Sequence, residues 1–175
     1  AQVGSSGCVI AAVDCSFIPK SGKHTFGLDK FWSSCAGNAK KGLEISVLAL
    51  IDVATANAWT LDVTQTPPQL KTKGEGDYTR LDFYIEQILD CLPQLKMVKY
   101  FVADGFYAKV KFIKALLSVN KHLITKLRPD ANLKFRFEGQ HVQKRGAKPK
   151  YEGKAVYDDL SKWHFKGKDA KYSYL

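Results

Sequence analysis

The sequence of 175 residues predicts an α/β fold, with a mixed sheet built in the order βββαβαβ. Short runs rich in β-branched and aromatic residues alternate with turn-forming clusters, which indicates buried strands. One longer segment, 81–92, repeats its apolar residues with helical spacing. Beyond it, strand-like and helical segments alternate, which is typical of parallel βαβ units. We therefore expect one domain with a proper core, followed by an extension.

The first three strands are predicted in the N-terminal third of the chain. The first covers about 8–18, and a polar stretch containing Gly and Lys then runs to Gly42. The second covers 43–51 and the third covers 58–64. The short turn-like connection 52–57 predicts that these two strands form an antiparallel hairpin.

The helical part begins with a capping signal. Residues 79–82 fit the Thr-x-x-Asp form of that signal, and Pro93 ends the first helix. A strand at 97–103, a helix at about 107–118 and a strand at 122–127 complete the predicted fold. The second helix places apolar residues on one face: Val110, Ile113 and Leu117. After residue 131 the helical period disappears, and short alternating stretches suggest more strands or a loosely held extension.

The composition is that of a basic globular protein, with 45% apolar and 25% charged residues and a net charge of +10. The excess of basic over acidic side chains is concentrated in residues 134–175, which carry 11 basic and 5 acidic side chains. Such a surface suits a polyanion such as DNA or RNA. Charge alone leaves open a basic surface that is merely solvated. No run reaches the roughly 18 apolar residues that a membrane span needs, so no membrane partner is expected.

The cysteines indicate a reducing compartment. They form no C-x-x-C pair and no zinc-finger spacing, so we interpret them as reduced thiols of a cytoplasmic protein. Residues 1–7 lack the basic and apolar regions of a signal peptide and an initiator Met, which suggests a fragment of a longer protein. The four cysteines are Cys8, Cys15, Cys35 and Cys91.

Two aspartates are the candidate chemical groups. Asp14 follows the apolar run 8–13, and Asp104 follows the run 97–103. A carboxylate at the carboxyl end of a buried strand lies at the sheet edge where open α/β folds bind ligands. Two such carboxylates on neighbouring strands could hold divalent metal through oxygen ligands. The alternative is that both residues merely start turns, where Asp is favoured.

Basic residues near these aspartates are candidate phosphate contacts. The segment 20–25 is not a P-loop, because Phe17 and His24 occupy positions where that motif needs Gly and Ser or Thr. Its lysines, Lys20 and Lys23, could still contact DNA phosphates near a cut site, or belong to an ordinary solvated loop.

Further basic residues lie later in the chain. Two lie at the end of the last predicted strand of the core, and four form a cluster that Gly and Pro keep from being a regular helix. We expect the cluster to contact the phosphate backbone rather than read bases, whereas a solvated edge is the alternative for the first two. Trp32 and Trp163 could stack on bases or be structural. The basic residues are Lys126, Arg128, Lys144, Arg145, Lys148 and Lys150.

The strand order and four segments together carry a family resemblance. The order βββαβαβ is that of the ribonuclease H-like fold, in which the first and fourth strands lie side by side. The whole pattern resembles DDE transposases of bacterial insertion sequences: the first-aspartate and second-aspartate motifs of that family, and two segments that follow them, match in order. The matching segments are 12–25, 100–109, 123–131 and 144–154.

The resemblance implies an enzyme that cuts and rejoins DNA with two Mg²⁺ or Mn²⁺ ions. Asp14 and Asp104 would hold the ions, one activating water or a 3′-hydroxyl and the other stabilising the leaving oxygen. The implied partners are transposon ends and target DNA, with no small-molecule substrate, and family members of this type act as dimers. The implied location is the bacterial cytoplasm, in association with the nucleoid.

The sequence departs from this family at the third acidic ligand. The family carries a Glu on a helix after a β-rich insertion, and no such helix follows residue 130. Glu138 and Glu152 lie in Gly- and Lys-rich surroundings and resemble surface residues. We therefore expect an incomplete catalytic core at 1–131 and the start of the insertion at 132–175, with weak metal binding and no activity for the fragment alone. The alternatives are a non-catalytic nucleic-acid-binding module of the same fold and a hydrolytic nuclease.

Overall fold

The computed structural model describes residues 8–70, 78–127, 131–140, 146–156, 159–168, 170 and 173–174. The chain divides into two compact units, Ala1–Arg128 and Pro129–Leu175. The proposed chemistry concerns the first unit, which contains both candidate aspartates.

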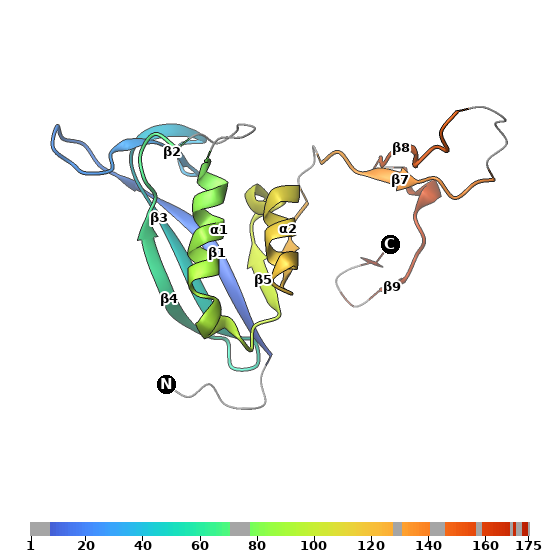
Figure 1. Cartoon of the computed structure of the whole chain (residues 1–175), viewed down its shortest axis with the longest axis horizontal. Helices are drawn as coiled ribbons and strands as arrows, with labels where there is room; N and C mark the ends of the chain where they lie inside the picture. The colour runs from blue at the N-terminus through green and yellow to red at the C-terminus, as the bar shows by residue number, and fades with distance from the viewer. Residues whose placement is uncertain are drawn as a thin grey trace. The chain divides into compact units, whose positions relative to one another are not determined.

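A six-stranded mixed sheet forms the first unit (Figure 1). Its order is β2-β3-β1-β5-β6, and β4 also pairs with β3. β1 pairs antiparallel with β3 and parallel with β5, which in turn is parallel to β6. This arrangement confirms the predicted ribonuclease H-like fold class. The strands are β1 (Val9–Pro19), β2 (Asp29–Ser33), β3 (Asn38–Asp52), β4 (Asn57–Gln65), β5 (Tyr100–Ala103) and β6 (His122–Thr125).

β2 is a strand that the sequence did not predict, because it lies in the polar stretch before Gly42. Gly42 pairs with Pro19 of β1 and also with Asp29 of β2, so these two strands lie on opposite edges of β3. With 15 residues, β3 extends beyond β1 and offers β2 a template. β2 forms by this pairing and by burying Phe31 and Ser33, which is a tertiary effect rather than a local one.

Two α-helices and two 3-10 helices complete the first unit. The predicted cap is confirmed, since the Asp82 carboxylate accepts hydrogen bonds from Thr79 N at 2.9 Å and from Thr79 Oγ1 at 2.6 Å. Pro93 lies in the 3-10 helix that follows the first α-helix. The helices are α1 (Arg80–Asp90), η1 (Leu92–Leu95), η2 (Gly105–Tyr107) and α2 (Val110–Ser118).

The predicted apolar face of the second helix is wrong. α2 buries Phe112 and Leu116, whereas Val110 is 67% and Leu117 is 52% exposed. The helix begins three residues later than predicted, because Lys109 has an extended backbone that separates η2 from α2. Phe112 and Leu116 are also apolar and four residues apart, so α2 offers a second apolar row, and this row with the large Phe ring is the one that is buried.

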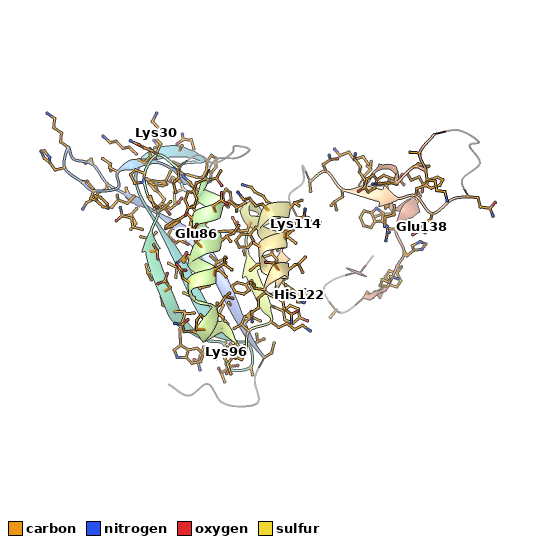
Figure 2. All side chains as sticks on the ribbon, viewed as in Figure 1. Lys30, Glu86, Lys96, Lys114, His122 and Glu138 are labelled. Carbon is orange, nitrogen blue, oxygen red and sulfur yellow. The ribbon has the colours of Figure 1, made fainter. Side chains whose placement is uncertain are left out.

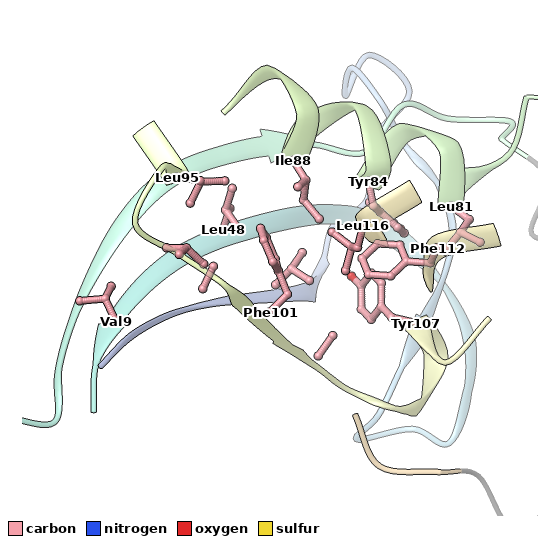
Figure 3. Close-up of a cluster of buried hydrophobic side chains, with 14 residues drawn as sticks. Val9, Leu48, Leu81, Tyr84, Ile88, Leu95, Phe101, Tyr107, Phe112 and Leu116 are labelled. Atoms are coloured by element: carbon pink, nitrogen blue, oxygen red, sulfur yellow. The ribbon is translucent and has the colours of Figure 1, made fainter. Parts of the chain in front are cut away.

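One apolar core lies between the sheet and the two helices, which cover the same face (Figure 3). Phe101 of β5 and Leu48 of β3 are fully buried in the same cluster as Tyr84 of α1 and Phe112 of α2. Ala11 and Val13 bring the centre of β1 into the same cluster. Packing therefore fixes the two central strands, β1 and β5, and with them the positions of Asp14 within β1 and of Asp104 after β5.

The second unit contains short strands. Its main hairpin pairs β7 with β8, and the rings of Phe135 and Trp163 contact each other with centroids 5.5 Å apart. Among its described residues, Ala155 is the buried apolar side chain. The elements are β7 (Lys134–Arg136), β8 (Tyr151–Lys154), η3 (Leu160–Lys162), β9 (Gly167–Lys168) and β10 (Ser173–Tyr174). Throughout the described part of the chain, every helix is too short or too polar to span a bilayer.

Candidate active site

Asp14 and Asp104 come together at the centre of the sheet. In the parallel pairing of β1 with β5, Val13 is opposite Ala103, so the next residue on each side is one of the two aspartates. Neighbouring strands lie about 4.8 Å apart. Both aspartates line one cavity of about 160 Å³. Two residues 90 positions apart in the sequence therefore share one site.

Asp14 lies inside β1 rather than at the end of a strand. It pairs with Val47 of β3, and β1 continues to Pro19. The strand that ends at this point is instead β5, the parallel partner of β1, which stops at Ala103. From Asp14 onwards, one edge of β1 has no strand beside it in the described sheet. Asp14 is exposed at this point.

Hydrogen bonds fix both the backbone and the side chain of Asp104. Its Oδ1 accepts a hydrogen bond from Phe106 N at 2.9 Å, which caps η2. Its backbone oxygen accepts a hydrogen bond from Thr125 Oγ1 of β6 at 2.8 Å. A carboxylate has about four lone-pair sites, so the cap leaves acceptor capacity for a cation. The carboxylate is therefore already oriented before any ligand binds.

Neutral groups lie beside the two carboxylates in the cavity wall. Cys15 Sγ and the Tyr107 hydroxyl are 3.1 Å apart. Burial raises the pKa of Cys15 to about 11, and burial also raises the pKa of Tyr107. Both groups are therefore uncharged at neutral pH and add no negative charge to the cavity.

Glu44 is a third carboxylate in the cavity wall, and sequence reasoning did not find it. It is only 7% exposed, and its Oε1 accepts a hydrogen bond from the Tyr84 hydroxyl at 2.5 Å. The available signal was its position in β3, where it alternates in phase with the buried residues Ser46 and Leu48. A charged residue in that phase must be paired or hydrogen-bonded.

Arg80 is a buried cation that sequence reasoning also missed, because the first turn of a helix is usually exposed. It is 8% exposed and lies over the Phe31 ring, 4.4 Å from its centroid. Its Nη2 donates to Lys30 O at 3.0 Å and lies 3.6 Å from Asp29 Oδ2. Its Nε is buried without a hydrogen-bond partner. Arg80 thus connects α1 to β2 at the cavity, which it also lines.

A second, larger groove has a volume of about 620 Å³ and also contains both aspartates. Its lining includes β1 from Asp14 to Pro19, Trp32 and residues 33–35 at the end of β2. Trp32 is 62% exposed. An exposed indole beside two carboxylates is compatible with the base-stacking alternative for this residue.

The other predicted contact residues are spread over several elements of both units. Lys20 and Lys23 are exposed beyond the end of β1, which runs about 16 Å from Asp14 to Pro19. Lys126 is exposed just after β6. Because Thr125 pairs with Ala103 of β5, Lys126 and Asp104 are neighbours in the register of these two strands. Two predicted contacts, Lys148 and Lys150, are exposed in the second unit. Three others lie outside the described residues: Arg128, Lys144 and Arg145.

The geometry defines a ribonuclease H-like domain with two adjacent carboxylates at the centre of its sheet. Within the described residues, no group of three or more His, Cys, Asp or Glu side chains could hold a metal ion. The sequence matches the family model "DDE superfamily endonuclease" over residues 2–171. The chain therefore belongs to this family of nucleases.

Two solved structures are similar to this chain at 14% identity. A piggyBac transposase in a synaptic complex with hairpin DNA has a TM-score of 0.44, covering 73% of this chain and 24% of that one. Endonuclease V of Ciona intestinalis, in complex with a DNA 23mer containing an inosine, has a TM-score of 0.39, covering 69% of this chain and 45% of that one. The chain thus spans less than half of either protein. No curated protein matches the sequence.

Proposed function

We propose that this chain is the core of a bacterial insertion-sequence DDE transposase, in which Asp14 and Asp104 hold Mg²⁺ or Mn²⁺ for DNA strand cleavage and transfer. The observation that carries the proposal is the register of β1 against β5, with Val13 opposite Ala103. That register puts two carboxylates at one cavity. Membership of a nuclease family supports the reaction class.

The donor set fits such a metal. Carboxylate oxygens are the ligands that Mg²⁺ and Mn²⁺ prefer. Asp104 keeps its orientation through the Phe106 hydrogen bond, and Asp14 through strand pairing on β3. When bound, the metal would activate water or a 3′-hydroxyl and stabilise the leaving oxygen. The residues of the chain would orient the metal and the scissile phosphate beside it.

A third acidic ligand is still needed, and we propose that it comes from outside the described residues. Glu44 lines the same cavity but is buried and accepts the Tyr84 hydrogen bond. The two aspartates and Glu44 do not form a metal-holding group. We therefore expect weak metal binding by these residues alone, and no cleavage without the third ligand.

A thermal-shift titration tests this proposal. At a free Mg²⁺ or Mn²⁺ concentration of ten times the Kd, binding should stabilise the protein by about 1.4 kcal/mol, or roughly 3–6 °C in Tm. Asp14→Asn and Asp104→Asn should each abolish this shift. Asp90→Asn, at the exposed end of α1, is the matched control and should respond like the wild type. A full metal response in both site variants would contradict the proposal.

Strand transfer is tested with the parent protein that contains this chain. A transposase incubated with its end DNA and a target duplex yields joined product, whereas a hydrolytic nuclease yields only cleaved strands. Both activities should disappear in Asp14→Asn. Cleavage that never leads to joining would identify the hydrolytic alternative instead.

A further inference from the structure

The β2–β3 hairpin and the loop before it form a basic surface of the first unit that the proposed metal site does not use. Residues 20–42 contain five lysines and one aspartate. That aspartate, Asp29, pairs with buried Arg80. All five lysines are exposed: Lys20, Lys23, Lys30, Lys40 and Lys41. Figure 2 labels Lys30 at the end of the unit that carries β2, whereas Lys96 lies at the opposite end.

Two of these lysines are directly opposite each other. Lys30 of β2 pairs with Lys41 of β3, so both side chains project from the same face of the hairpin. Cross-strand neighbours have Cβ atoms about 5 Å apart, and like charges in this position are destabilising. Over 8–70 and 78–127, the described ion pairs involve other lysine and arginine residues. The fold therefore brings two cations together without an acidic partner.

The lysine pair is held in place by a buried anchor. The backbone oxygen of Lys30 accepts a hydrogen bond from Arg80 Nη2, and the preceding residue, Asp29, forms the ion pair with the same guanidinium. Arg80 also lies over Phe31, the next residue of β2. The backbone of β2 is thus fixed to α1 on both sides of Lys30. Such preorganisation lowers the entropy that a charged ligand must overcome.

The same hairpin leads to the two carboxylates. Trp32 is two residues from Lys30 and lies on the same face of β2. Trp32 also lines the cavity and the groove that contain Asp14 and Asp104. The rise from Lys30 to Trp32 is about 6.6 Å, close to two steps of about 3.4 Å along one DNA strand. A nucleic-acid backbone that leaves the site past Trp32 would next meet the lysine pair.

We propose that Lys30 and Lys41 form a two-lysine clamp for the phosphate backbone of the DNA that flanks the cleavage site. A phosphate between the two ammonium groups replaces their repulsion by two attractions. The inference rests on the proposed function for the identity of the DNA as substrate. Binding of DNA at the clamp requires no metal ion. Experiments can therefore disprove the clamp without disproving the metal site, and the reverse.

The sharpest test combines stability and DNA binding in one substitution. Lys30→Glu converts the repulsive pair into an attractive one, so the free protein should melt about 1–3 °C higher. In a buffer that contains a metal chelator, the same variant should bind a short labelled duplex of arbitrary sequence at least several-fold more weakly than the wild type does. Lys96→Glu makes the same change of net charge at an exposed site remote from β2. It should change neither quantity appreciably.

The number of phosphate contacts is read from the salt dependence of binding. Lys30→Gln with Lys41→Gln should reduce the slope of log affinity against log salt by about two, because each phosphate contact contributes about one. Lys96→Gln with Lys114→Gln should leave the slope unchanged. Equal losses for both pairs would overturn the clamp, as would a wild type that does not bind the duplex. A selective loss for the Lys30 and Lys41 pair would support the clamp even if metal failed to stabilise the protein.

Discussion

At the scale of single residues, the two carboxylates differ in how the chain holds them. Asp14 is positioned by a continuous strand, since β1 pairs with β3 on both sides of it. Asp104 follows the last residue of β5, and its side chain accepts the hydrogen bond from Phe106 N that begins η2. Asp104 therefore has a structural role besides its proposed role as a ligand, and substitutions can separate the two.

Replacing Asp104 should show this separation. Asp104→Ala removes the acceptor for Phe106 N and should lower the free energy of unfolding by about 1 kcal/mol without metal, as for a lost cap. Asp104→Asn keeps a capping oxygen and should be nearly neutral in the same urea titration. Both variants should lose the metal response. If Asp104→Asn destabilises as much as Asp104→Ala, the cap is not the source of the effect.

Cys15 gives a prediction about alkaline pH. Burial raises its pKa from 9.0 to about 11 in the folded protein. Between these values the unfolded chain releases the thiol proton and the folded chain keeps it, so stability should fall as the pH rises from about 9 to about 11. Below pH 9 both states are protonated and the effect is absent. In urea titrations over this pH range, Cys15→Ser should show a shallower decline than the wild type.

The control for that experiment is Cys35→Ser, which replaces an exposed thiol and should follow the wild-type profile. An identical alkaline decline in Cys15→Ser and the wild type would show that other groups produce it.

At the scale of elements, β3 organises the sheet. β1 lies on one of its edges, and β2 and β4 follow each other along the other edge. Gly42 is the residue at which β1 and β2 face each other across β3. A Cβ atom there would lie 2.4 Å from Ile18 O and 2.4 Å from Phe17 Cε2. The absence of a side chain therefore allows the three strands to meet.

Gly42→Ala should strain this junction. Because one of the clashing atoms is backbone, the strands must separate, and we expect a loss of about 1–3 kcal/mol in the free energy of unfolding. Gly37→Asn is the matched control, since Gly37 has φ +63°, has open space around it, and Asn tolerates that conformation. Chemical denaturation compares the two. Equal stability of both variants would contradict the role assigned to Gly42.

Local patterns were sufficient for the strands and helices that bury a face of their own. The runs that became β1, β3, β4 and β5 and the capped α1 were predicted because their apolar spacing matches their structure. β2 was missed because it is short and depends on the extension of β3. The exposed face of α2 was mistaken for its buried face because the helix carries two apolar rows, and packing against the sheet decides which row is buried. Arg80 and Glu44 were missed since their burial depends on partners distant in sequence.

At the scale of the whole molecule, stability and the proposed chemistry are located in the same unit. The buried apolar cluster draws its members from residues 9–116. In the described part of Pro129–Leu175, Ala155 is the buried apolar residue, while that unit supplies 11 of the 27 basic side chains. Apolar burial is the main favourable term in folding. The first unit should therefore fold by itself, and the second should contribute mainly charge.

A chain ending at residue 128 tests this division. It contains the complete apolar cluster and both aspartates, so it should unfold cooperatively with a Tm within about 3 °C of the full chain. Its Mg²⁺-induced shift should be unchanged. Its DNA affinity should be lower and less dependent on salt, because fewer cations remain to contact phosphates. Unchanged DNA binding would show that the basic residues of the second unit, including Lys148 and Lys150, do not contact DNA. A lost metal response would show instead that the second unit holds part of the site.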